Sequence, residues 1–232
     1  MLSSVDYALW FGSAILQAGA VVCAIRARSL FRFFPLNLYM AVAFLLTLLR
    51  YFVFWSYGIL SPQYIYFYYY SDALLTVFLF FALMGLYSQV LSELRASHYV
   101  RISAILLLGL TALFSYSIAA GSKDRLITKF VVELGQNMNF VGVVLTYLLW
   151  GLVMKLRETR TQLIQLILAL GVYFSAFAAN YALRNLYPSL SMVWQYVPPL
   201  MALWLPLAWA YTFLKTPDDA RLTPAHVAAP NR

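Results

Sequence analysis

The sequence predicts an all-α fold of the polytopic membrane class, a seven-transmembrane-helix bundle with its N-terminus out and its C-terminus in. The first observation is composition, since 63% of the residues are hydrophobic and 10% are charged, whereas soluble domains carry charges on about a quarter of their residues. The second is length, because seven apolar stretches each reach the roughly 20 residues that a bilayer crossing needs. The third is that Lys and Arg fall mainly at one end of the expected helices.

The expected spans follow one another closely and leave only short loops. The first span has no basic region before it and no small-residue cleavage pattern after it, so we expect it to be retained in the mature protein. No polar stretch approaches the roughly 50 residues of an independent domain. We therefore expect residues 1–215 to form one transmembrane domain and residues 216–232 to form a disordered cytoplasmic tail. The seven spans are expected at 7–25, 34–59, 65–91, 102–120, 130–154, 161–183 and 190–214.

Basic residues beside the spans predict the orientation, because Lys and Arg are retained on the cytoplasmic side of a membrane. Eleven lie at one set of span ends and four at the other. This excess predicts a multi-pass protein of the cell inner (plasma) membrane. It also accounts for most of the net charge of +8, so we expect the lipid bilayer as a partner and no nucleic acid. The eleven are Arg26, Arg28, Arg32, Arg95, Arg101, Lys155, Arg157, Arg160, Lys215, Arg221 and Arg232, and the four are Lys123, Arg125, Lys129 and Arg184.

Three ionisable residues lie inside the expected spans: Arg50, Asp72 and Glu133. Charges are costly in hydrocarbon and usually face the bundle interior, a partner or a water-filled cavity. At 1.5 Å per residue, Arg50 lies about 12 Å and Asp72 about 9 Å below the outer end of its span. The loop between the second and third spans is short, so these spans should pack as antiparallel neighbours. The matching depth predicts a contact between Arg50 and Asp72 that offsets part of their desolvation cost.

Further polar residues follow the outer halves of several spans. Glu133, Gln136 and Asn137 have the i, i+3, i+4 spacing that predicts a shared helical face. The sixth span adds Tyr173 and Asn180, and the third and seventh spans add polar side chains at comparable depth. The pattern predicts either a cavity open to the exterior or interhelical hydrogen bonds that hold the bundle together. The candidate ligand-binding or intramembrane polar cluster is Arg50, Asp72, Thr76, Glu133, Gln136, Asn137, Asn180 and Gln195.

Pro198 and Pro199 fall in the middle of the seventh expected span. Proline removes a backbone hydrogen bond and bends a helix. The pair therefore predicts either a hinge beside Gln195 or a static kink.

The densest run of aromatic residues, Tyr64 to Tyr70, lies where the third span enters from the outer surface. Aromatic rings with a polar edge suit the headgroup layer, so an interfacial belt is the first interpretation. A stacking platform for an aromatic ligand is the alternative.

Several functions are excluded by residues that the spans lack. His98 and His226 both lie outside the spans, so neither provides a haem ligand within the membrane, and an intramembrane zinc site has no ligand set. The last span has no lysine before Lys215 at its inner end, which excludes a retinal Schiff base. Cys23 is the only cysteine, so no intramolecular disulfide forms. We expect no metal, no cofactor and, because no catalytic motif is recognisable, no enzymatic activity.

Three segments resemble a family of uncharacterised seven-helix integral membrane proteins that are common in acidobacterial genomes. These are FFPLNLY at 33–39, YFYYYSDALL at 66–75 and ELGQNMNF at 133–140. The resemblance implies a seven-helix bacterial membrane protein and carries no activity to transfer. Members often have a tryptophan or glutamate near the position of Ser71 and Asp72.

Three functions remain open at the level of sequence. The first is a binding or sensory module with an outward-facing polar pocket for a small-molecule ligand. The second is a proton-coupled small-molecule transporter that uses Asp72 or Glu133. The third is a structural subunit of a larger membrane complex, which contacts a membrane-protein partner through the apolar first and fourth spans.

Overall fold

The computed structural model describes residues 4–92, 97–121, 126–187, 196–217 and 220–221. This part of the chain forms seven helices, all of them long and apolar enough to cross a bilayer, and it contains no strand of a sheet. The predicted all-α, seven-helix fold is confirmed. The helices are α1 (Ser4–Arg26), α2 (Phe34–Tyr57), α3 (Pro62–Val90), α4 (Ser97–Ala120), α5 (Leu126–Lys155), α6 (Thr161–Leu186) and α8 (Val197–Lys215).

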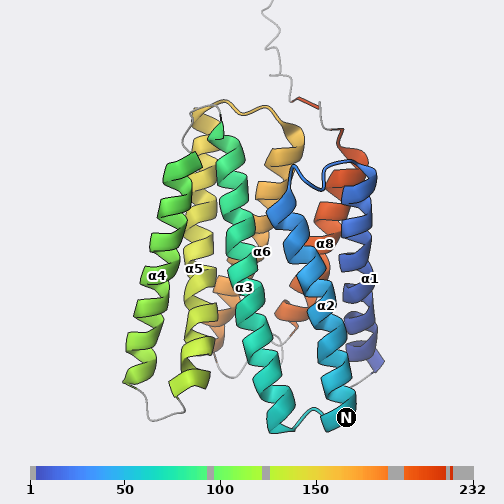
Figure 1. Cartoon of the computed structure of the whole chain (residues 1–232), viewed down its shortest axis with the longest axis vertical. Helices are drawn as coiled ribbons and strands as arrows, with labels where there is room; N and C mark the ends of the chain where they lie inside the picture. Colours follow the sequence, from blue (N-terminus) through green and yellow to red (C-terminus); the bar gives the residue numbers. More distant parts are fainter. Residues whose placement is uncertain (1–3, 93–96, 122–125, 188–195, 218–219, 222–232) are drawn as a thin grey trace, which may run out of the picture.

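The helices run alternately in opposite directions, as Figure 1 shows from the blue N-terminal helix to the red C-terminal one. We call the end where α1 begins the N-terminal end, and the opposite end the basic end, since α1 finishes there at Arg26 and α5 at Lys155. Six helices form a closed ring, because α1, α2, α3, α5, α6 and α8 each pack against the next and α8 packs against α1. Helix α4 lies outside this ring against α5 and α3.

The α2–α3 connection shows why these two helices are antiparallel neighbours. Helix α2 ends at Gly58, whose φ of 81° suits glycine and whose N–H donates to the carbonyl of Phe54 at 2.8 Å. Helix α3 begins after Ser61, whose hydroxyl oxygen accepts the N–H of Tyr64 at 3.1 Å. Pro62 then occupies the first turn, where a missing N–H carries no penalty.

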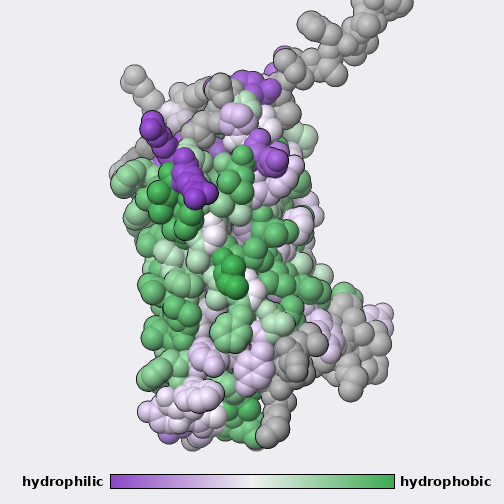
Figure 2. All heavy atoms as spheres, turned by 90° about the vertical axis from the view of Figure 1, so that its right-hand side faces the viewer, coloured by the Kyte–Doolittle hydropathy of each residue, from purple (hydrophilic) through white to green (hydrophobic). Residues whose placement is uncertain are grey.

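Apolar packing concentrates in the half of the bundle near the basic end. Phe33, Leu36, Trp209 and Phe213 are buried there. Glycine brings helices close together in this core, because a Cβ on Gly142 would overlap the Phe174 ring of α6 and one on Gly85 would lie 2.9 Å from Pro35 Cγ. Outward-facing side chains are largely apolar along the middle of the molecule and polar toward the basic end (Figure 2). Exposed apolar side chains on α2, α4 and α5 include Phe52, Trp55, Ile105, Leu110, Leu113, Phe114, Val144 and Leu148.

The first residues of the predicted tail pack back onto the bundle. Thr161 donates its N–H to the Ala220 carbonyl at 3.2 Å, and Arg160 and Arg221 form an isolated antiparallel bridge. Residues 218–219 and 222–232, for which disorder was predicted, lie outside the described residues.

Candidate functional site

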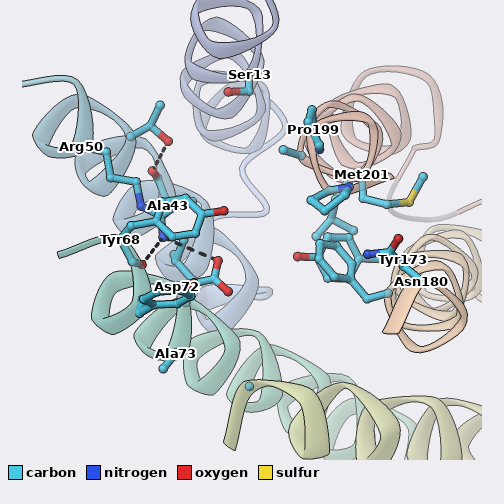
Figure 3. Close-up of a pocket in the computed structure, with 18 of the residues that line it drawn as sticks. Ser13, Ala43, Arg50, Tyr68, Asp72, Ala73, Tyr173, Asn180, Pro199 and Met201 are labelled. Carbon is cyan, nitrogen blue, oxygen red and sulfur yellow. Dashed lines mark hydrogen bonds and ion pairs between the residues drawn. The ribbon is translucent and has the colours of Figure 1, made fainter. Parts of the chain in front are cut away.

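A cavity of about 720 Å³ occupies the centre of the ring, and all six ring helices contribute to its wall. It reaches the N-terminal end, because its lining includes residues in terminal turns: Asp6 of α1, Tyr64 of α3, Arg184 of α6 and Pro198 of α8. In the opposite direction it extends to Met40, in the second turn of α2. We call this space the central cavity; Figure 3 shows part of its lining.

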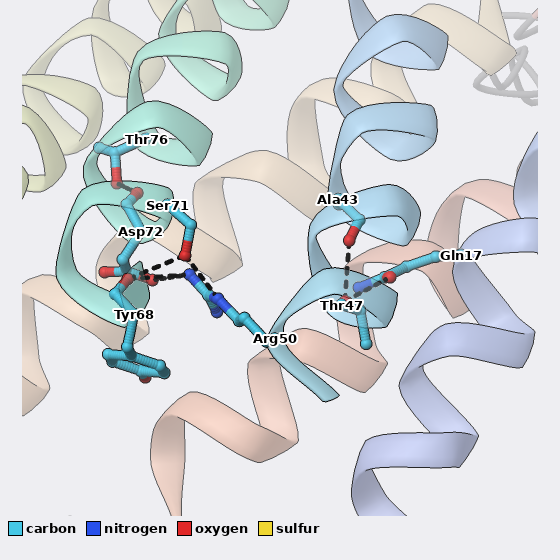
Figure 4. Close-up of polar contacts among 8 residues, drawn as sticks. All are labelled: Gln17, Ala43, Thr47, Arg50, Tyr68, Ser71, Asp72 and Thr76. Carbon is cyan, nitrogen blue, oxygen red and sulfur yellow. Dashed lines mark hydrogen bonds and ion pairs between the residues drawn. The ribbon is translucent and has the colours of Figure 1, made fainter. Parts of the chain in front are cut away.

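Arg50 crosses from α2 to α3 and is held there by several groups (Figure 4). Its Nε donates to Ser71 Oγ at 2.7 Å and its Nη2 donates to the Tyr68 carbonyl at 3.3 Å. Its guanidinium carbon lies 4.5 Å from the centre of the Tyr68 ring, a cation–π distance. Nη2 also lies 3.6 Å from Asp72 Oδ1. The predicted contact between Arg50 and Asp72 is therefore confirmed, although its geometry is longer than a hydrogen bond.

The two charged groups differ in how they face the cavity. The Arg50 side chain is 14% exposed, because α3 covers it, whereas the Asp72 side chain is 45% exposed. Asp72 lies in the third turn of α3 and lines the central cavity, so its exposed surface is cavity surface. It shares the cavity wall with four tyrosines, Tyr39, Tyr68, Tyr173 and Tyr181.

Two rows of aromatic side chains line the cavity at helical spacing. Tyr64 and Tyr68 precede Asp72 on one face of α3 at i, i+4 and i+8, and Tyr173, Phe177 and Tyr181 repeat the spacing on α6. The Tyr173 and Phe177 rings are 4.7 Å apart between centroids. We call these two rows the aromatic rows. The belt interpretation of the tyrosine tract thus needs correction for Tyr64, Tyr68 and Tyr69, which line the cavity.

Asn180 lies on the α6 wall and is 5% exposed. Its side-chain oxygen Oδ1 has no hydrogen-bond partner among the described residues. Figure 3 places Asn180 and Tyr173 on the wall that faces Arg50, Tyr68 and Asp72. A buried acceptor without a donor is costly, so a group that supplies a donor at this position gains by binding.

The other members of the predicted polar cluster divide into those near the cavity and those away from it. Gln136 lines the cavity. Thr76 lies one turn after Asp72. Its hydroxyl donates to the Asp72 backbone carbonyl at 3.0 Å, so its hydrogen bond stays within α3. Gln195 lies outside the described residues.

The prediction that Glu133 and Asn137 share one face with Gln136 toward a common site is wrong. Glu133 forms an ion pair with Lys129 at 3.0 Å, and Asn137 donates to Ser115 Oγ of α4 at 3.0 Å. Neither residue lines the cavity. Residues 136 and 137 differ by 100° around a helix. Helix α5 packs against α3 and α6 within the ring and against α4 outside it. Gln136 therefore faces the cavity, whereas Asn137 faces α4.

The predicted position of Pro198 and Pro199 in the middle of a helix is also wrong. Helix α8 begins at Val197, so both prolines occupy its first turn, where no intrahelical N–H bond is lost. They line the mouth of the cavity. Pro206 is the proline inside α8, and it lines the cavity more deeply.

Several lining residues were missed in the sequence. Tyr39 of α2 lines the deep part of the cavity, as Tyr173 of α6 does. Thr47 donates to the Ala43 carbonyl at 2.8 Å and lies 3.1 Å from Gln17 Oε1 of α1 (Figure 4). The sequence does contain a pattern that could have identified these lining residues, because Tyr39, Thr47 and Arg50 fall on one face of α2 at i, i+8 and i+11.

On the side of the basic end, packed aromatic rings form the floor of the cavity. Tyr39 packs edge-on against Trp209 at 5.9 Å, and Phe33 contacts Phe213 at 6.0 Å. Polar contacts tie the helix ends together beyond this aromatic floor. Thr216 after α8 donates to Gln165 Oε1 of α6 at 2.7 Å.

Arg160 forms the second of these polar ties, in the connection between α5 and α6. It pairs with Glu158 at 2.5 Å and donates to the Gln89 carbonyl of α3 at 2.9 Å. The Arg160 guanidinium, together with backbone N–H groups, holds the pKa of the Glu158 carboxyl below its usual value of 4.5.

Comparison of the chain with protein-family models, with curated proteins and with solved structures found no match.

Proposed function

We propose that this chain is a multi-pass protein of the inner (plasma) membrane that binds a small molecule in the central cavity, as a receptor-like binding or sensory module. The observation that carries the proposal is the cavity itself, about 720 Å³ within a ring of six helices. Binding sites for small molecules are typically about 300–1,000 Å³, with mostly apolar walls and a few placed polar groups. The Arg50 and Asp72 pair and the Asn180 oxygen supply those polar groups.

The proposed orientation places the N-terminal end outside the cell and the basic end in the cytoplasm. Lys129 and Arg184 are the basic residues of the described helices at the N-terminal end, whereas the basic end carries many more. Such an asymmetry directs the basic end to the cytoplasm. The cavity then takes its ligand from the exterior. The described basic residues of the basic end include Arg26, Arg28, Arg32, Lys155, Arg157, Arg160, Lys215 and Arg221.

Proton-coupled transport is the alternative, and the observation that favours it is an acid, Asp72, facing the cavity. Transport requires the aromatic floor at Phe33 and Trp209 to open toward the basic end. Glu133 suits this role less well, since it is paired with Lys129 outside the cavity. Ligand uptake into liposomes that contain the purified chain supports transport, and binding without uptake supports the binding module.

The test of ligand binding uses two glycines of the same helix. A Cβ on Gly135 or on Gly151 meets no atom within 4 Å, but Gly135 lines the cavity and Gly151 does not. Wild type, Gly135→Phe and Gly151→Phe are purified in detergent. Their thermal unfolding is then recorded with a library of small cations, anions and neutral molecules. A compound that binds the folded state raises the unfolding temperature.

We expect stabilising compounds to act on wild type and on Gly151→Phe and to lose their effect on Gly135→Phe, because the added ring occupies the cavity. Both variants must unfold cooperatively without ligand for the comparison to count. Compounds that stabilise all three proteins equally bind elsewhere, and that result contradicts the proposal.

A further inference from the structure

At the Arg50 and Asp72 pair, the central cavity exposes more of the negative partner than of the positive one. Arg50 is covered by α3, with donors directed to Ser71 Oγ and to the Tyr68 carbonyl. Asp72 is the more exposed partner, 45% against 14%, and the ion-pair distance of 3.6 Å leaves its carboxylate free to accept further hydrogen bonds. At the mouth, Asp6 and Arg184 contribute one charge of each sign. A ligand inside the cavity therefore meets a carboxylate that is more exposed than its countercharge.

The wall opposite Asp72 also contains a buried acceptor. Asn180 is 95% buried by residue surface, since 5% is exposed, and its Oδ1 has no partner among the described residues. A carboxylate and an amide oxygen both require donors. A ligand that brings N–H groups satisfies both, whereas an anion or an ether satisfies neither.

The aromatic rows supply the rest of the environment. Tyr68, Tyr173, Phe177 and Tyr181 line the space around Asp72. Aromatic faces attract cations and pack against flat or apolar groups. Arg50 already uses the Tyr68 ring in this way, at 4.5 Å.

We infer that the central cavity binds a protonated organic amine that carries an aromatic or apolar body. The ammonium group is held by Asp72, a further N–H donor on the ligand reaches Asn180, and the body lies between the aromatic rows. This inference rests on the proposed function and names the ligand class of the same site.

The test uses three probes of one shape and different charge: benzylammonium, benzyl alcohol and benzoate. Each is titrated calorimetrically into the purified full-length chain in detergent. The heat measured with Gly135→Phe is subtracted, because it reports partition into the micelle. Asp72→Asn removes the charge and keeps the shape. Glu133→Gln is the matched control, since Glu133 is a second carboxylate inside a span but lies outside the cavity.

We expect saturable binding of benzylammonium and binding of the other two probes at least about tenfold weaker, a difference of about 1.4 kcal/mol. Asp72→Asn should lose this preference and Glu133→Gln should keep it. Phe177→Leu should weaken benzylammonium as well, because it removes one ring of the aromatic rows. This variant keeps the test valid if Asp72→Asn does not fold.

Two results overturn the inference. If benzoate or benzyl alcohol binds as tightly as benzylammonium, and Gly135→Phe abolishes that binding, the cavity binds ligands but the amine class is wrong. If no probe binds, the amine class again fails, and the library screen with Gly135→Phe and Gly151→Phe separately decides whether the cavity binds anything.

Discussion

Arg50 illustrates how far reasoning from the sequence reaches at the scale of single residues. Depth along two neighbouring helices was sufficient to predict its contact with Asp72, which lies 3.6 Å away. The shorter bonds, to Ser71 and to the Tyr68 carbonyl, were not predicted. They depend on the rotation of α2 about its axis and on one rotamer of a long side chain, and neither follows from spacing along the chain.

The two members of this pair should contribute unequally to stability. Arg50→Ala should lower the free energy of unfolding by about 2–3 kcal/mol, because it removes charged hydrogen bonds to α3. Asp72→Asn should cost less than about 1 kcal/mol, because the pair is long and the carboxylate faces the cavity. Denaturant unfolding in detergent, with the double mutant, measures the coupling. A coupling above about 2 kcal/mol would show that the pair mainly holds α2 against α3.

Asn180 should be more important for binding than for folding. Asn180→Leu replaces a buried acceptor that lacks a partner in the described chain with an apolar group of similar size. The free energy of unfolding should therefore stay within about 0.5 kcal/mol of wild type or rise. Chemical unfolding tests this, with Asn139→Leu as the control. Asn139 is buried on α5 and donates to the Gly135 carbonyl at 2.8 Å, so its replacement should be the more destabilising one.

At the scale of helices, α5 shows why a polar stripe does not define a site. Spacing placed Glu133, Gln136 and Asn137 on a face about 100° wide. Only Gln136 lines the cavity, because Asn137 bonds to Ser115 of α4 and Glu133 pairs with Lys129 of α5 itself. The aromatic repeats on α3 and α6 were the better signal, because residues at i, i+4 and i+8 diverge by only about 40° per step.

Helix α5 also provides a test of close packing. Gly142→Ala should lower the free energy of unfolding by about 1–3 kcal/mol, because the new methyl group overlaps the Phe174 ring and pushes α5 away from α6. Gly151→Ala on the same helix meets no atom within 4 Å. It should raise stability by about 0.5–1 kcal/mol through helix propensity alone. Equal effects of the two changes would contradict the packing at Gly142.

At the scale of the whole molecule, the helices were predictable and their arrangement was not. Length and apolar composition located all seven helices, with α8 beginning later than expected. The ring, the central cavity and the outer position of α4 depend on which helices pack together. A single sequence contains no direct record of those pairings, because each apolar helix surface is compatible with lipid and with several neighbours.

Closure of the basic end should depend on pH through Glu158. Its pKa is lowered in the folded chain by Arg160, so the stabilisation is complete above the unfolded value of 4.5. It is lost as the pH falls through the lowered value. Wild type should therefore lose stability as the pH falls below the unfolded value of 4.5, and Glu158→Gln should lose less over the same range. Unfolding curves across this range test the prediction. Parallel losses in both proteins would contradict it.

The proposed orientation should be visible in fusions to the C-terminus. A green fluorescent protein folds in the bacterial cytoplasm, whereas alkaline phosphatase becomes active only after export. We expect a C-terminal fluorescent fusion to be bright and a C-terminal phosphatase fusion to be inactive, with the reverse for fusions after Leu60 in the α2–α3 connection. An active C-terminal phosphatase would invert the proposed topology.

The outer position of α4 has a consequence for how the cavity can change shape. Helices α1, α2 and α3 run in the same sequence of directions as α5, α6 and α8, and each group fills half of the ring. Around the ring, α1, α2 and α3 therefore occupy positions that correspond in order and direction to those of α5, α6 and α8, and α4 is the extra crossing that returns the chain so that both groups begin at the same face. The two halves meet along two seams, α3 with α5 and α8 with α1. A tilt of one half against the other therefore widens the cavity at one face as it narrows it at the opposite face.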